Sequence, residues 1–295
     1  MSRVKSCFIS RWGGQGSIVQ VDFSQLEVIG VAYLSQDPNM YKDIKAGIDS
    51  HSQSASWLTD HTYEEVLEGH RAGDKYFSQV RKDAKGPRFE LQYGAGAGSI
   101  AENNGISKAA AQGFIDNYYS RYHVLQAWQD GNIRAVKAAA EGRSKVTVVD
   151  GKEHTRRWTV GKLPSITGRW YTFRQFDTPD WVQESTGRKY DFSPTQIKNF
   201  PSQGFATGDV VPMMLGHSYR RLLRSSRFRD KALHIGTIHD SILYDVHDSV
   251  LDSFKPGIKN LMELAPRYIK ETWGIEFDLP LKAEVESGRS WDTLA

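Results

Sequence analysis

Residues 18–28 read IVQVDFSQLEV, and this stretch decides the fold. Its first half is apolar and β-branched, which is typical of a short buried strand. From Ser24 onward the apolar residues follow helical spacing, with Ser24 as a candidate N-cap and Glu27 at the third position of a capping box. Asp22 is a lone carboxylate at this switch from strand to helix. We therefore predict that rigid backbone presents Asp22 in a cleft.

A second lone carboxylate, Asp240, lies in the short link between the apolar segments 232–238 and 242–246. This spacing predicts a hairpin that presents Asp240 at the edge of a sheet. Two acids on separate strand ends can share two Mg²⁺ ions, because Mg²⁺ prefers hard oxygen ligands and keeps phosphates and water in its shell. Such ions, about 4 Å apart, activate a hydroxyl and stabilise a leaving pyrophosphate. Either acid alone is better interpreted as an ordinary turn residue.

The third motif, RKDAKGPRFELQYG (81–94), favours the metal interpretation. Arg81, Lys85, Phe89 and Tyr93 recur at every fourth position, which on a helix forms one stripe. The stripe is cationic at one end and aromatic at the other. A nucleoside triphosphate has complementary ends, with anionic phosphates at one and a sugar and flat base at the other. We predict that the cations bind phosphates and that the aromatic rings pack on sugar and base. The alternative is an amphipathic helix with an aromatic core edge, which explains the cation spacing less well.

Gly86-Pro87 lies inside this stripe, and a proline in a helix interior costs about 3 kcal/mol. Two arrangements stay open on the sequence alone. The helix is kinked there, or it begins near Pro87 and leaves Arg81 and Lys85 on a preceding segment.

The rest of the chain predicts an α+β fold, because strands at both ends enclose a long helical region. The expected elements are helices over 40–142, a β-rich insert near 145–176 with Asp150-Gly151 as a hairpin turn, a helical region over about 194–229 interrupted by Pro201 and Gly204, a helix over about 249–272, and a last strand, LKAEV. Ser107 is a plausible helix N-cap.

Composition excludes several classes of protein. The 295 residues are 39% hydrophobic and 25% charged, as in soluble globular domains. Cys7 is the only cysteine, which excludes an intrachain disulfide and a cysteine-based zinc site. No stretch approaches the roughly 18 apolar residues of a membrane span, and the first ten residues lack the apolar core of a signal peptide. We predict an intracellular, cytoplasmic protein (host cytoplasm if viral) with no membrane partner.

The net charge of +3 does not by itself indicate a nucleic-acid-binding protein. The basic residues are nevertheless clustered in YRRLLRSSRFRDK (219–231). A solvated helix face and a phosphate-binding surface explain this cluster equally well.

Together the three motifs resemble motifs A, B and C of family A DNA polymerases, the bacterial DNA polymerase I class. DFSQLE (22–27), the R-x₃-K-x₃-F-x₃-YG stripe and IHDS (238–241) occur in the order of that family. The similarity continues through KAGIDSHSQSA, NFPSQG and the terminal LKAEVESGRSWD, so it covers nearly the whole chain.

The resemblance implies a right-hand fold with an antiparallel palm sheet and an inserted helical fingers subdomain. The palm would comprise residues 1–38 and 195–295, and the fingers 39–194. The implied activity is template-directed DNA synthesis, in which a primer 3′-hydroxyl attacks a dNTP with the help of two Mg²⁺ ions. The implied partners are primer–template DNA and dNTPs.

The resemblance also assigns residue roles. Asp22, Asp240 and the Phe23 carbonyl would bind the metal ions, and Lys85 would also donate a proton to pyrophosphate. The residues implied in nucleotide binding are Phe23, Gln25, Glu27, His51, Arg81, Lys85, Phe89 and Tyr93. Among these, Glu27 would crowd the 2′ position of the sugar, Phe89 would sit against the sugar, and Tyr93 would stack near the templating position. The residues implied in contacting primer and template are Asn199, Gln203 and His239, with Gln203 in the minor groove.

One departure from the family pattern is Ser241, which stands where a second acid is usual. Single-subunit RNA polymerases also have His-Asp-Ser here, so an RNA polymerase of the same superfamily is an alternative. Glu27 and Phe89 favour the DNA enzymes. A non-catalytic DNA-binding subunit and a two-metal nuclease are further alternatives, but neither has a task for both acids and the cationic stripe.

A second departure is that the chain reaches motif A by residue 22, without the thumb, the first part of the palm or an exonuclease domain. We expect a split polymerase of a phage-like type, in which a second polypeptide supplies the thumb and the N-terminal palm. The exposed apolar surface of half a palm would favour such a partner. The alternative is a truncated reading frame.

Overall fold

The computed structural model describes residues 4–187 and 191–294 and divides the chain into two compact units. The first unit comprises Met1–Tyr33 and Gln203–Ala295, and the second comprises Leu34–Ser202. The chain passes between the units within helices α1 (Leu26–Ser35) and α11 (Pro194–Phe205). No helix in the described part of the chain has the length and apolar character needed to cross a membrane.

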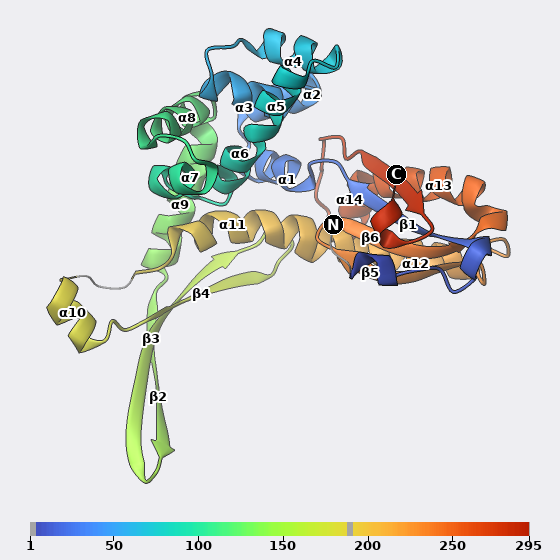
Figure 1. Ribbon diagram of the computed structural model, residues 1–295. Coiled ribbons are helices and arrows are strands. Elements are labelled where there is room, and N and C mark those ends of the chain that lie inside the picture. The colour runs from blue at the N-terminus through green and yellow to red at the C-terminus, as the bar shows by residue number, and fades with distance from the viewer. Residues whose placement is uncertain (1–3, 188–190, 295) are drawn as a thin grey trace. The chain divides into compact units, whose positions relative to one another are not determined.

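An antiparallel sheet in the order β5-β6-β1-β7 forms the centre of the first unit (Figure 1). Its strands are β1 (Gly16–Phe23), β5 (Ala232–Ile238), β6 (Ser241–His247) and β7 (Ala283–Gly288). The two central strands, β1 and β6, are rich in β-branched and aromatic residues, which suit a strand with neighbours on both sides. The predicted α+β class is confirmed, because the first strand pairs with strands from the other end of the sequence.

Three helices accompany this sheet, namely α12 (Val211–Arg224), α13 (Asp248–Glu263) and α14 (Ala265–Trp273). Tyr244 of β6 marks the face that α12 and α13 cover, since its ring packs on Phe254 and its hydroxyl donates to Ser218. Val19 lies opposite Tyr244 in the register, and strand residues alternate between the two faces. Asp22 therefore lies on the face away from these helices. Short 3₁₀ turns occur at Lys5–Cys7, Gly13–Gln15 and Trp291–Thr293.

The second unit is largely helical, as the sequence predicts. Its helices are α2 (Pro38–Lys45), α3 (Ser50–Leu58), α4 (Tyr63–Arg71), α5 (Lys75–Asp83), α6 (Lys85–Gln92), α7 (Ala97–Asn104), α8 (Lys108–Arg121), α9 (His123–Ala138) and α10 (Asp180–Thr186). Many of them begin where a side-chain oxygen accepts backbone N–H groups of the first turn. The caps are Asp37, Asp49, Thr62, Asp74 and the predicted Ser107.

The β-rich insert is a three-stranded sheet in the order β2-β3-β4 (Figure 1). Its strands are β2 (Glu141–Val149), β3 (Lys152–Pro164) and β4 (Trp170–Phe176). Asp150 and Gly151 both have positive φ, at 52° and 72°, as a two-residue type I′ hairpin turn requires. The predicted hairpin is confirmed. A small core built from Val136, Leu163, Phe173, Phe192 and Ile197 joins this sheet to α9 and α11.

Two local predictions are wrong. Helix α1 begins at Leu26 rather than just after Ser24, and the Ser24 hydroxyl donates to Glu284 instead of capping the helix. Pro201 lies inside α11 and does not interrupt it, and Ile197 and Phe205 on either side of it are buried. The irregularity comes later, as a π-helical turn at Ala206–Val210 before α12.

Candidate active site

The structure brings Asp22 and Asp240 to the same edge of the sheet. Asp22 is the penultimate residue of β1, and its partner in the β1–β6 register is Ser241. Asp240 lies in the tight turn between β5 and β6, as predicted. The backbone N–H of Phe23 donates to the Asp240 carbonyl at 3.4 Å. Two acids from opposite ends of the sequence are thus neighbours.

The surroundings of Asp22 disfavour its negative charge. Burial and then the neighbouring Asp240 raise the pKa of Asp22 to about 7, with smaller contributions from Glu284 and Glu286. The Oδ1 atom of Asp22 is buried and has no hydrogen-bond partner. A buried carboxylate oxygen beside further acids is favourable only when a cation or a proton compensates it.

Sequence reasoning missed two acids of this cluster, Glu284 and Glu286 of β7. Glu284 lies opposite Asp22 in the β1–β7 register, and Glu286 lies two residues on, hence on the same face. The Ser24 hydroxyl donates to Glu284 at 3.1 Å. The alternation of acids in AEVES indicates that Glu284 and Glu286 share one face of a strand. Only the strand register, however, places them beside Asp22.

The acidic cluster fits the donor set of Mg²⁺, which takes one or two carboxylates and completes its shell with phosphates and water. In the part of the chain that the structure describes, no group of three or more His, Cys, Asp or Glu side chains has the arrangement of a preformed metal cage. The unpartnered Asp22 oxygen beside Asp240 can nevertheless serve as a protein ligand for an ion that takes its other ligands from the substrate and water.

Two residues that flank the acids have strained backbone. Gln25 has φ 59° and His239 has φ 52°, a left-handed conformation that is uncommon for residues other than glycine. Gln25 precedes α1 and accepts the N–H of Ile29, so it is the residue at which the helix begins. Such strain clusters at functional sites because the surrounding structure must impose it.

The remaining predicted residues of the first unit have simpler settings. Glu27 lies in the first turn of α1, and Gln203 lies near the end of α11. Ser241 adds no carboxylate to the turn, and its hydroxyl donates to the Ile238 carbonyl at 2.8 Å.

The cationic stripe belongs to the second unit and is divided between two helices. Helix α5 ends at Asp83 and α6 begins at Lys85, so the break falls three residues before Pro87. Pro87 is tolerated because the first turn of a helix has no intrahelical partner for its N–H groups. The single kinked helix is therefore wrong. The second arrangement is confirmed for Arg81, which lies on the preceding helix, but not for Lys85, which starts the helix that contains Pro87.

Arg81 is held by an acid that the sequence did not single out. Its Nε and Nη2 atoms donate to the two oxygens of Asp49 at 2.7 and 2.9 Å. Asp49 also caps α3 through Ser52, and these hydrogen bonds lower the pKa of Asp49 despite its burial. The pair fixes the position of the Arg81 guanidinium.

His51 lies among cations. Burial, followed by the charges of Arg81, Lys85 and Arg88, lowers the pKa of His51 to about 4. Its Nδ1 atom is buried without a hydrogen-bond partner. Arg88, which sequence reasoning missed, is only 5% exposed and donates to the Ser54 hydroxyl at 3.1 Å. This corner of the second unit is electropositive and has an unused ring nitrogen.

The aromatic end of the stripe faces solvent. Phe89 is 58% exposed, and its ring makes an edge-on contact with Tyr93 at 4.5 Å between centroids. The alternative of an aromatic core edge is therefore wrong for Phe89. Gly94 has φ 82°, and a Cβ there would approach the backbone of Thr195 to 3.2 Å, so glycine is needed where α6 meets α11. Asn199 of α11 has a buried, unpartnered Oδ1.

Comparison with known proteins gives the family. The model of DNA polymerase family A matches residues 1–293. The chain belongs to DNA polymerase family A. Among its relatives, DNA polymerase I of Lactococcus lactis (strain IL1403) is 26% identical over 274 residues, which cover 93% of this chain and 26% of that protein. DNA polymerase I of Bacillus subtilis (strain 168) is also 26% identical, over 275 residues with the same coverage.

Solved structures of the polymerase family show the fold. The POL domain of Pol1 from M. smegmatis, determined in complex with DNA primer-template and dNTP, matches with a TM-score of 0.66 and 20% identity. The match covers 99% of this chain and 42% of that one. The predicted family A resemblance and palm-and-fingers class of fold are confirmed. The chain spans about a quarter of the length of the curated family A relatives named above.

Proposed function

We propose that this chain catalyses template-directed DNA synthesis, by transfer of a nucleotide from a dNTP to a primer 3′-hydroxyl in the 5′–3′ direction. The observation that carries the proposal is the meeting of Asp22 and Asp240, with a buried, unpartnered Asp22 oxygen. Membership of family A supports it, as does the likeness to a polymerase domain that binds primer-template and dNTP.

In this proposal Asp22, Asp240 and the Phe23 carbonyl hold two Mg²⁺ ions. When bound, these ions neutralise phosphate charge and activate the attacking hydroxyl. The protein's own contribution is positioning: β1 and the β5–β6 turn hold both carboxylates on rigid backbone, and the charges of Glu284 and Glu286 add to the demand for a cation.

The nucleotide contacts that we propose are those that the resemblance to family A implies. Lys85 and Arg81 bind the triphosphate, and Lys85, which is exposed, donates a proton to pyrophosphate. The exposed ring of Phe89 packs on the sugar, and Tyr93 stacks near the templating position. The other nucleotide contacts that we propose are Gln25, His51 and Glu27, the last against the 2′ position of the sugar.

DNA contacts are proposed for Asn199, Gln203 and His239. The buried, unpartnered Oδ1 of Asn199 and the strained backbone of His239 are the features that support functional roles for these two residues. In the same proposal the first unit is the palm and the second is the fingers. The units divide after Tyr33 and after Ser202, which is five residues before the predicted 38 and eight residues after the predicted 194.

The test is primer extension by Asp22→Ala and Asp240→Ala variants, with Asp252→Ala as a matched control on the exposed surface of α13. We expect either active-site change to lower the rate of nucleotide addition by at least about a thousandfold, because one metal-binding carboxylate is lost. DNA binding should largely survive. Extension by both variants at the wild-type rate would refute the proposal.

Ser241 keeps one second candidate open, an RNA polymerase of the same superfamily. The serine leaves the turn with one acid where family A usually has two, as in His-Asp-Ser enzymes. Extension of one primed template with dNTPs and with rNTPs separates the two candidates, and preference for rNTPs would favour the RNA polymerase. A chain that incorporates neither nucleotide with any divalent metal would instead be a non-catalytic DNA-binding subunit.

We further propose a second polypeptide that supplies the thumb and the N-terminal part of the palm. Support comes from β5, an edge strand whose Ile235 and Ile238 are 46% and 37% exposed. Extension by the chain purified from its native source should need a co-purifying protein. Full activity of the chain alone would reject this partner.

A further inference from the structure

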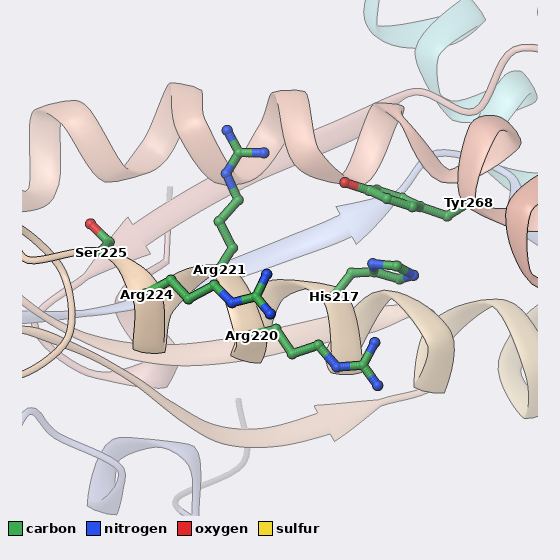
Figure 2. A pocket seen from close by; sticks show the side chains of 6 residues that line it. All are labelled: His217, Arg220, Arg221, Arg224, Ser225 and Tyr268. Carbon is green, nitrogen blue, oxygen red and sulfur yellow. The ribbon is translucent and has the colours of Figure 1, made fainter.

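A cavity with a volume of about 670 Å³ lies beside α12 in the first unit (Figure 2). Its lining residues are His217, Arg220, Arg221, Arg224, Ser225 and Tyr268. All but Tyr268 come from α12 and the residue that follows it, and Tyr268 comes from α14. Figure 2 shows the Tyr268 ring above His217, and the two rings stack at 3.8 Å between centroids.

The helical period explains why these side chains line one cavity. Helix α12 buries Val211, Met214, Ser218 and Leu222. Arg220, Arg221 and Arg224 follow His217 by three, four and seven residues. These four residues therefore share another stripe of the same helix. This stripe runs along about 10 Å of helix axis.

In the described part of the chain, no acid is paired with the three arginines that line the cavity. Within residues 4–187 and 191–294, the side chains of Arg220, Arg221 and Arg224 form no ion pair or hydrogen bond. By contrast, Arg267 on the neighbouring α14 is paired with Glu271. The segment 219–231 contains six basic residues and one acidic residue, a net charge of +5 against +3 for the whole chain. Burial and Arg220 lower the pKa of His217, so this residue contributes a flat ring rather than a charge near neutral pH.

The cavity is separate from the candidate active site, although both belong to the first unit. Helix α12 covers the sheet face of Tyr244, while Asp22 lies on the other face. In addition, Ser218 of α12 contacts His234 near the start of β5, whereas Asp240 follows the other end of this strand. Seven strand residues span about 23 Å.

We propose that this cavity binds the sugar-phosphate backbone of single-stranded DNA. Uncompensated arginines favour phosphates, and an aromatic stack beside them offers a face for an unpaired base, a combination typical of single-strand binding. The stripe from His217 to Arg224, about 10 Å long, matches roughly three stacked nucleotides at 3.4 Å each. The inference concerns binding alone and does not depend on the proposed catalytic activity.

The test measures binding of a short fluorescein-labelled single strand to the full chain by anisotropy across a salt series. The variant is the triple change Arg220→Gln, Arg221→Gln and Arg224→Gln. The charge-matched control changes Lys5, Lys259 and Lys270 to Gln, three exposed cations of the same unit that do not line the cavity. Circular dichroism and thermal unfolding check that both triples are folded, as surface changes usually permit.

We expect the cavity triple to weaken binding about tenfold at low salt and to reduce the slope of log K against log salt by about 2, since each lost phosphate contact removes about 0.7. Tyr268→Ala should weaken binding without changing this slope. Photocrosslinking with a 5-iodouracil strand should mark His217 or Tyr268. Primer extension on a short template should stay at the wild-type rate in the triple, which separates this inference from the proposed function.

Three results would overturn the proposal. The control triple weakens binding as much as the cavity triple, which would indicate a general charge effect. Duplex DNA or inorganic polyphosphate competes as well as the single strand does, which would indicate another occupant. The crosslink maps only to residues outside the cavity, which would indicate that the strand binds elsewhere on the chain.

Discussion

At the residue scale, burial changes the chemistry of several polar side chains. His234 of β5 lies against α12, where its Nε2 and the Ser218 hydroxyl are 2.7 Å apart. Burial lowers the pKa of His234 to about 4. The neutral ring is therefore part of the packing between helix and sheet, and its protonation opposes folding.

The pH dependence of His234 follows from the sign of this shift. Below about pH 6.5 the unfolded chain takes up a proton that the folded chain does not bind until about pH 4, so stability falls as the pH drops through this range. We expect a loss of about 1–2 kcal/mol, because partial exposure screens the effect. Urea unfolding at both ends of the range should show a smaller loss in His234→Gln. An NMR pKa for His234 near 6.5 would contradict this account.

The proposed selection of deoxyribose by Glu27 can be tested by changing this one side chain. If its carboxylate crowds the 2′ position, Glu27→Ala should raise ribonucleotide incorporation about tenfold or more relative to deoxyribonucleotides. The measurement is single-nucleotide extension with each dNTP and its matching rNTP. Glu64→Ala, on the exposed first turn of α4, is the control. Unchanged discrimination in Glu27→Ala would remove the proposed role.

At the scale of elements, the start of α3 and the end of α5 are joined by one acid. Asp49 caps α3 through the Ser52 N–H at 3.1 Å and also holds Arg81 of α5 through both of its oxygens. The Arg81 and Asp49 side chains are 21% and 19% exposed, so solvent screens this pair only partly. The helix that carries Arg81 thus depends on a cap in another helix.

Removing this acid should affect both elements. We expect Asp49→Ala to lower the free energy of unfolding by about 2–3 kcal/mol, through loss of the cap and of the Arg81 partner. The Michaelis constant for dNTP should also rise, because Arg81 is no longer positioned. Asp74→Ala is a matched control that removes the cap of α5 without touching Arg81. An Asp49→Ala variant with the stability of the wild type would contradict the argument.

At the scale of the whole molecule, the sheet of the first unit collects like charges that a bound cation or a proton relieves. Mg²⁺ should therefore stabilise the folded chain, by about 2.7 kcal/mol at a hundredfold excess over the dissociation constant. Thermal unfolding with EDTA and with Mg²⁺ measures this shift. The shift should be lost in Asp22→Ala and kept in the Asp252→Ala control. An equal shift in Asp22→Ala would place the ion elsewhere.

The sequence by itself determined the local structure of this protein. The Asp150-Gly151 turn and the Ser107 cap depend on interactions between residues a few positions apart. Such interactions are encoded where they occur, so a pattern of apolar spacing and turn residues predicts them. The order of the three motifs likewise pointed to family A before any contact was known.

Only the tertiary structure decided how distant residues meet. The register of β1 with β6 and β7 placed Asp22 beside Asp240 and Glu284, and no spacing in the sequence contains that register. The same holds for the Arg81–Asp49 pair and for the cavity between α12 and α14. Burial and neighbouring charge set the pKa of Asp22. Both arise from the packing of the folded chain and cannot be read from its amino-acid sequence.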